Sequence, residues 1–241
     1  MAIALDKVGD LNSPDKSVRQ TEKLQRRSAV ASPLKVEFQF DFGSPNAYLA
    51  EYALPGIEQR TGVKFDYVPV LLGGIYKATN NMSPFDSLRG IKNKQEYNAL
   101  ETQRFIRRHN ITKFKPNPFF PVNTLMLMRG AVAAQFENVF EPYFRAAYHH
   151  MWEEPKKMDD VETFRAAFIS SGIDIDKLIA RAQQDDVKKK LIDVTTDAVN
   201  RGAFGSPTFF VGTEMFFGKD QLRDVEESIV EQLVAAKAKS A

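Results

Sequence analysis

Residues 36–49 read VEFQFDFGSPNAYL and give the clearest indication of the fold. Polar and apolar side chains alternate over 36–42, and the apolar ones are aromatic or β-branched, which predicts a β-strand. Gly43 ends this pattern. Ser44 then suits a helix N-cap, and Pro45 suits the first helical position, where a missing N–H costs nothing. The stretch therefore predicts a strand, a tight turn that carries a serine, and a single helix from Pro45 to about Gln59.

A second stretch, GAFGSPTFFVGTEMFFGKDQL (202–222), predicts the other end of the same domain. Ser206-Pro207 indicates a turn. Two short strands are expected at Thr208–Val211 and Glu214–Phe217, followed by a helix from Lys219 to about Ala236. A strand and a helix near the start of the chain, combined with a hairpin and a helix near its end, are typical of a thioredoxin-like domain.

The segment between these stretches predicts one further strand and a helical insertion. Phe65–Leu72 has the pattern of a strand that can pair in parallel with the first one across the intervening helix. Pro69 indicates a sheet edge or a bend, and Gly73-Gly74 is expected to close the strand. The fold class is therefore α/β, a thioredoxin-like fold with a large inserted all-α domain. The expected parts are a flexible N-terminal extension (1–34), the thioredoxin-like domain (35–84 and 200–241) and the inserted helical domain (85–199).

Composition narrows the functional classes. The 241 residues carry a formal net charge of +2 and are 43% hydrophobic, so nucleic acid and anionic membranes are not expected partners. No apolar run approaches the ~20 residues that span a bilayer. The chain has no cysteine, which excludes disulfides, thiolate metal sites and a redox thiol of its own. A cytoplasmic location is expected. The extension 1–34 is interpreted as mobile or surface-lying, with docking onto a partner subunit as the alternative.

Ser44 has a structural and a functional interpretation. As an N-cap it needs no other role. Alternatively, its hydroxyl donates to a bound thiolate at the helix N-terminus, where free N–H groups carry partial positive charge. Lowering a thiol pKa by about two units takes roughly 2.7 kcal/mol, which the dipole and a hydrogen bond of about 1.5–3 kcal/mol supply together. No histidine lies nearby in sequence as a base, so Ser44 is predicted to be a donor rather than a nucleophile.

Three other features could bind a small acidic ligand. A cis bond at Ser206-Pro207 would offer the Ser206 backbone to an extended peptide such as glutathione. Lys77, Asn80 and Asn81, expected in a loop after the strand, are either solvated or suited to carboxylates. Asp220 is either a first-turn acid or the partner of an α-ammonium group.

A metal site is not expected. His149 and His150 lie near Glu153 and Glu154, but adjacent helical residues diverge by about 100°, so the two imidazoles are not expected to chelate together.

Seven segments in order resemble the 2-hydroxychromene-2-carboxylate isomerase family, close kin of the kappa-class glutathione transferases, over about 36–235. These segments are DFGSPNAYLA (41–50), PVLLGGIYKATNN (69–81), the helix start from Lys94 to Tyr97, FPVNTLMLMRGA (120–131), AYHHMWEE (147–154), TDAVNRGAFGSPTFFV (196–211) and MFFGKDQL (215–222). The resemblance implies a homodimer that binds glutathione, with Ser44 matching the family's catalytic serine.

The resemblance also implies roles for further residues. The residues implied to bind glutathione are Asn81, Lys94, Ser206, Pro207, Gly218, Lys219 and Asp220. Lys77 matches a lysine that faces the substrate carboxylate, and Asn123 is expected near the same cleft. Three departures from the family pattern, at Ser206, Gln221 and the segment 83–93, bear mainly on the acceptor substrate.

The leading hypothesis is a glutathione-dependent isomerase of an aromatic or unsaturated carboxylate, in which the thiolate adds, a bond rotates and the thiol leaves. A kappa-like transferase that conjugates glutathione permanently is the first alternative. A non-catalytic thioredoxin-fold module that binds peptides is the second. Disulfide exchange is excluded, because no side chain can form the mixed disulfide.

Overall fold

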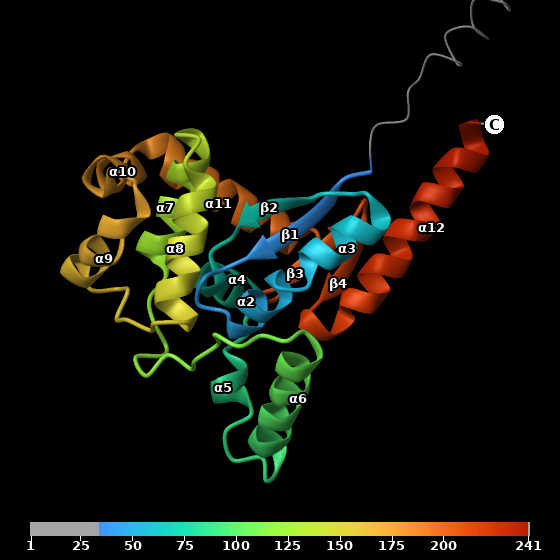
Figure 1. Cartoon of the computed structure of the whole chain (residues 1–241), viewed down its shortest axis with the longest axis horizontal. Coiled ribbons are helices and arrows are strands. Elements are labelled where there is room, and N and C mark those ends of the chain that lie inside the picture. Colours follow the sequence, from blue (N-terminus) through green and yellow to red (C-terminus); the bar gives the residue numbers. More distant parts are fainter. Residues whose placement is uncertain (1–33, 241) are drawn as a thin grey trace, which may run out of the picture. The chain divides into compact units, whose positions relative to one another are not determined.

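A four-stranded sheet with the order β2-β1-β3-β4 organises the structure (Figure 1). Strands β1 (Val36–Phe40) and β2 (Phe65–Pro69) are parallel, with Val36 opposite Phe65. Strand β3 (Thr208–Val211) runs antiparallel to β1 and forms a hairpin with β4 (Glu214–Phe217). The predicted parallel pair, the late hairpin and the edge position of the Pro69 strand are therefore confirmed.

The computed structural model describes residues 34–240, which form one compact unit. The predicted extension 1–34 lies outside these residues except for Leu34. Within the described part, no helix combines the length and apolarity that a membrane crossing requires. The helices are α2 (Pro45–Glu51), α3 (Leu54–Thr61), α4 (Leu72–Thr79), α5 (Pro84–Ser87), α6 (Lys94–Arg108), α7 (Leu125–Phe136), α8 (Phe140–Trp152), α9 (Val161–Ala167), α10 (Ile175–Ala182), α11 (Asp185–Asn200) and α12 (Leu222–Ser240), with short 3₁₀ turns at Ile169–Ser171 and Lys219–Gln221.

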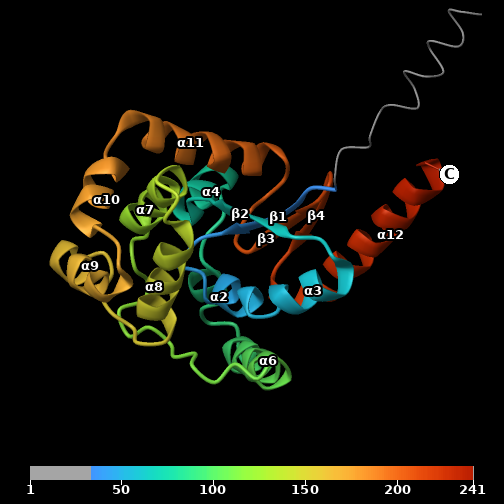
Figure 2. The same cartoon turned by 45° about the horizontal axis from the view of Figure 1, so that its top comes forward.

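Helices cover both faces of the central strand β1, and all five of its residues are buried. On the aromatic face, the ring of Phe40 packs edge-to-face on Phe144 of α8 at 5.2 Å. On the opposite face, Glu37 pairs with Arg201, which follows α11, at 2.8 Å. Figure 2 shows α11 on one side of the sheet and α2 and α3 on the other. The polar residues of the alternating pattern are thus buried and need partners within the protein.

Two sequence predictions in the first half of the chain are wrong. The single helix expected from Pro45 to about Gln59 is two helices, because Pro55 lies in the first turn of α3 and cannot donate to the preceding turn. The strand expected to reach Leu72 ends at Pro69, and the glycines expected to close it lie inside α4. Helix α4 begins there because the backbone N–H groups of its first residues find acceptors elsewhere in the fold, as described below.

Gly130 of α7 allows the close approach of α8. A Cβ at Gly130 would collide with the hydroxyl of Tyr143, which is buried and donates to the Leu127 carbonyl at 2.8 Å. We expect Gly130→Ala to lower the free energy of unfolding by about 1–3 kcal/mol, the usual cost of overpacking. Gly73→Ala, also in a helix but with open space around the new methyl group, should raise stability by about 0.5–1 kcal/mol. Urea unfolding of both variants tests this, and equal effects would contradict it.

Candidate functional site

Ser44 and Ser206, far apart in sequence, lie together at the start of α2. Ser44 is the N-cap of α2, and its Oγ accepts the N–H of Ala47 at 3.2 Å. The same hydroxyl donates to the carbonyl oxygen of Ser206 at 2.8 Å. The Ser206-Pro207 peptide bond is cis. Both interpretations of Ser44 therefore start from one geometry: it caps the helix, and it also contacts the loop predicted to hold a peptide.

Asp41, which sequence reasoning did not select, connects the segments around Ser44. Its carboxylate is fully buried and accepts hydrogen bonds from the N–H of Gly43 (2.8 Å), the N–H of Leu72 (2.8 Å) and the hydroxyl of Thr124 (3.0 Å). Burial raises the pKa of Asp41, although these three donors oppose the rise. The carboxylate thus joins the turn after β1, the first turn of α4 and the residue before α7.

One signal in the sequence could have identified Asp41. An aspartate followed two residues later by a glycine is typical of a turn in which the side chain binds its own backbone, as Asp41 and Gly43 do here. Gly43 is also needed for packing, because a Cβ there would lie 2.9 Å from Cγ2 of Thr124.

A cavity of about 800 Å³ opens beside Ser44. Its walls come from three segments: the turn and start of α2, the first turns of α4 with the loop after it, and the loop before α7. Ser206 and Phe217 close a further side, and Tyr76, Phe85 and Phe120 give it aromatic surface. Among the described residues, no lysine or arginine lines it. The cavity has the size and the mostly apolar lining of a small-molecule site.

The structure places two of the predicted amides on this cavity. Asn81 lines it and donates from Nδ2 to the carbonyl oxygen of Phe204 at 2.9 Å, which connects the end of α4 to the loop before Ser206. Asn123 also lines it, and its Oδ1 accepts the N–H of Leu125 at 3.0 Å. Each amide retains hydrogen-bonding capacity for a ligand.

The other predicted residues do not line the cavity. Lys77 is exposed and lies within α4, not in the expected loop, and Asn80 ends that helix. Lys94 begins α6, with its ammonium 5.9 Å from the ring centre of Tyr97. The local sequence predicts a loop at Lys77, because it does not show the distant hydrogen-bond acceptors that allow α4 to begin at Leu72.

The segment Gly218–Asp220 adjoins the proline loop. The N–H of Gly218 donates to the carbonyl oxygen of Pro207 at 2.9 Å. Lys219 is buried, ion-pairs with Asp220 at 2.6 Å and lies with its ammonium 5.0 Å from the ring centre of Phe105. The charges of the lysine and the aspartate therefore compensate one another.

Together, the strand, the capped helix, the proline loop and the hairpin define a thioredoxin-fold protein with a serine at the start of its first helix. The chain belongs to the DSBA-like thioredoxin domain family, whose model matches residues 35–230. This member has no cysteine, so it lacks the thiol that disulfide exchange requires.

Known proteins similar to this chain include two kinds of enzyme by name. The 2-hydroxychromene-2-carboxylate isomerase of Sphingobium xenophagum is 27% identical over 196 residues, covering 81% of this chain and 98% of that protein. Glutathione S-transferase kappa 1 of Rattus norvegicus is 24% identical over 204 residues, covering 79% and 88%. A solved 2-hydroxychromene-2-carboxylate isomerase structure superimposes with a TM-score of 0.69 at 26% identity, over 86% of this chain and 98% of that one.

Proposed function

We propose that this protein is a glutathione-dependent isomerase of the 2-hydroxychromene-2-carboxylate type, acting on an aromatic or unsaturated carboxylate. The observation that carries the proposal is the contact of Ser44 with the Ser206 carbonyl at the wall of an 800 Å³ cavity. The similarity to isomerases over four-fifths of the chain supports the reaction class. The absence of cysteine supports a thiol that is bound rather than built in.

The residues at the cavity fit a small peptide. The Ser206 carbonyl accepts one hydrogen bond, from Ser44, and keeps a second lone pair for a peptide N–H. Asn81 lies on the same wall, and Gly218, Lys219 and Asp220 flank the loop from the other side. The volume leaves room for both a tripeptide and an aromatic ring.

Ser44 acts as the hydrogen-bond donor in this proposal. When bound, glutathione would supply a nucleophilic thiol that is regenerated in the reaction. The Ser44 hydroxyl, which donates to the Ser206 carbonyl oxygen, would donate to the sulfur instead and so exchange a neutral acceptor for a charged one. A hydrogen bond to a charged acceptor is worth about 1.5–3 kcal/mol, more than the ~1 kcal/mol of a neutral one. The exchange therefore favours the ionised thiol.

A measurement of the free thiol concentration during turnover tests the proposal. With limiting glutathione and excess substrate, we expect many turnovers per glutathione and full recovery of free thiol. Loss of one thiol per turnover would instead establish the kappa-like transferase. Peptide binding without any turnover would establish the non-catalytic module.

The cation that meets the substrate carboxylate lies at the edge of the cavity. Lys77 is the residue implied by the family resemblance, and it follows Tyr76, which lines the cavity. Arg129 of α7 lines two adjoining hollows that share Leu125 with the cavity, and it forms no ion pair with any described residue.

We expect Lys77→Met or Arg129→Met to raise KM for the carboxylate about 10-fold or more, the value of a charge-assisted hydrogen bond, with little change in glutathione affinity. Lys189→Met, on α11 outside these hollows, is the matched control. An unchanged KM in both variants would show that neither cation binds the carboxylate.

The homodimer implied by the resemblance and the cytoplasmic location expected from the composition stay predictions. Light scattering of the full chain at several concentrations tests the first, and a monomer at all of them would contradict it.

A further inference from the structure

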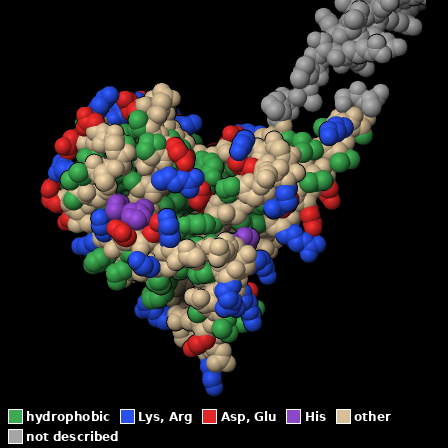
Figure 3. All heavy atoms as spheres, viewed as in Figure 1, with side chains coloured by type: hydrophobic (Ala, Val, Ile, Leu, Met, Phe, Trp, Pro, Cys, Tyr) green, Lys and Arg blue, Asp and Glu red, His purple; other side chains and the backbone are tan. Residues whose placement is uncertain are grey.

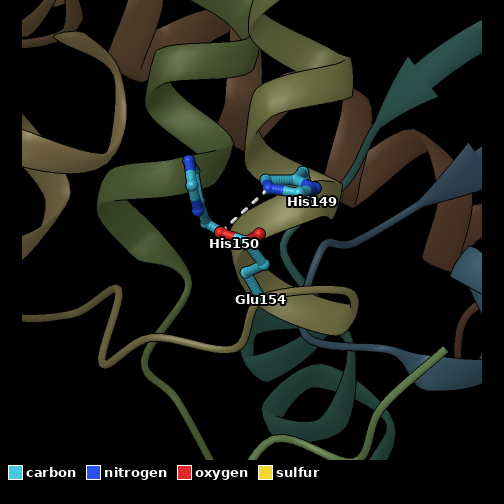
Figure 4. A group of neighbouring side chains, drawn as sticks. All are labelled: His149, His150 and Glu154. Carbon is cyan, nitrogen blue, oxygen red and sulfur yellow. Dashed lines mark ion pairs between the residues drawn. The ribbon is translucent and has the colours of Figure 1, made fainter. Parts of the chain in front are cut away.

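A cluster of His149, His150 and Glu154 lies at the C-terminal end of α8, away from the cavity (Figure 4). One ligand atom from each residue lies within 4.8 Å of the other two. The expectation that the adjacent imidazoles diverge is wrong, because their ring centres are 4.7 Å apart. Glu154 joins them because the chain turns back after α8, with its N–H donating to the His149 carbonyl oxygen at 2.8 Å.

His149 is held with one nitrogen free for a ligand bond. Its Nδ1 lies 3.0 Å from a carboxylate oxygen of Glu153. Glu153 is itself fixed by the hydroxyls of Tyr48 and Tyr52, at 3.1 and 3.2 Å, and its side chain is only 15% exposed. An imidazole that donates Nδ1–H to a carboxylate presents the lone pair of Nε2, the arrangement that usually supports a metal-ligating histidine.

The spacing between His149 and Glu154 suits two ligands of one ion. Nε2 of His149 and Oε2 of Glu154 are 3.4 Å apart, as the dashed line in Figure 4 marks. Two ligands at about 2.1 Å from a tetrahedral Zn²⁺ lie about 3.4 Å from one another. Little movement is therefore needed to place an ion between them.

His150 supplies an independent indication. The residue is 7% exposed, and its Nδ1 is buried without a hydrogen-bond partner in the described part of the chain. Buried polar atoms are nearly always paired, so an unpaired one in a native protein needs an explanation. His150 belongs to the same cluster as the two ligand atoms described above.

We propose that His149, His150 and Glu154 bind a divalent transition-metal cation of the zinc type. The ligand atoms are Nε2 of His149, Nδ1 of His150 and a carboxylate oxygen of Glu154, and the fourth position is left to water. Two imidazoles favour Zn²⁺, Cu²⁺ or Ni²⁺ over Mg²⁺ and Ca²⁺, which prefer oxygen ligands. Access from solvent is open, because the Glu154 side chain is 63% exposed, and Figure 3 shows histidine side chains beside acidic ones on this surface.

The site would connect two parts of the fold. The last residue of α8, Trp152, donates from Nε1 to the carbonyl oxygen of Phe42, just before the turn that carries Ser44. The carboxylate of Glu153 accepts a hydrogen bond from the hydroxyl of Tyr48 in α2. A bound ion would join the end of α8 to the turn after it, and would stabilise the folded chain by mass action, without touching the cavity.

Titration of ZnCl₂ into the chelator-treated full chain, followed by calorimetry, tests the proposal. We expect one site, weakened at least 10-fold by either His149→Gln or Glu154→Gln, and a rise in Tm with Zn²⁺ that both variants lose. Both residues are partly exposed, so these variants should fold. The chain has three histidines and no cysteine, so His109→Gln is the matched control and should bind Zn²⁺ as the wild type does.

NMR of the imidazole groups provides the second measurement. The signals of His149 and His150 should shift together at one equivalent of Zn²⁺, while that of His109 stays in place. Unchanged affinity in both variants, or Zn²⁺ binding that leaves the His149 and His150 signals unmoved, would overturn the proposal.

Discussion

Ser44→Ala is expected to lower kcat at saturating glutathione about 10- to 100-fold, the kinetic equivalent of losing one hydrogen bond to a charged group. The Ser44 hydroxyl makes two hydrogen bonds: it accepts the Ala47 N–H and donates to the Ser206 carbonyl oxygen. The substitution therefore removes the helix cap as well as the donor. The lost cap should cost about 0.5–2 kcal/mol of stability, which a folded domain tolerates. The pKa of the bound glutathione thiol, followed by thiolate absorbance, should rise in the same variant.

Ser83→Ala is the matched control for this variant. Ser83 is also a helix N-cap followed by proline, it accepts the N–H of Phe85 at 3.2 Å, and it lines the same cavity. Its loss should leave kcat within about two-fold of the wild type, the size of an effect below 0.5 kcal/mol. Equal activity of the Ser44 variant and this control would remove Ser44 from the mechanism.

Asp41→Asn is expected to lower the free energy of unfolding by about 1–3 kcal/mol, the cost of one buried donor left without an acceptor. Oδ1 of Asp41 accepts the N–H of Gly43, and Oδ2 accepts both the N–H of Leu72 and the hydroxyl of Thr124. An amide has one oxygen, so in either orientation its NH₂ group faces a donor. Burial raises the pKa of Asp41, because it disfavours the charged form. Removing this buried charge therefore offsets part of the lost stability.

Asp86→Asn is the control that shows whether the loss of any carboxylate at this cavity lowers stability. Asp86 lines the same cavity, but it is exposed and pairs with Arg89 at the surface. Its substitution should change stability by less than about 0.5 kcal/mol. If urea unfolding gives the same midpoint for both variants, Asp41 does not hold the three segments together.

Local patterns predicted the sheet well and the tertiary contacts poorly. The strand at Val36–Phe40 follows from alternation, and the two short strands at Thr208–Val211 and Glu214–Phe217 lie where the sequence predicts them. The break at Pro55 was present as a signal in the sequence and was overlooked. The start of α4 could not be predicted, because the N–H groups of Leu71 and Leu72 bind Thr195 and Asp41, which lie far away in sequence.

The candidate site shows the same division. The meeting of Ser44 with Ser206 followed from placing two short motifs on one known layout, and the structure brings their atoms to 2.8 Å. Asp41 was missed because an alternating strand does not show which polar residue will be buried among three donors. The proximity of His149 and His150 was missed because helical spacing alone ignores ring orientation and the turn that returns Glu154.

A crystal structure of the full chain with glutathione would show whether Ser44 meets the bound thiol. We expect the tripeptide in the cavity, with its backbone against Ser206 and its sulfur within hydrogen-bonding distance of the Ser44 hydroxyl. Glutathione bound with its sulfur away from Ser44, or a cavity that stays empty at saturating concentration, would contradict this expectation.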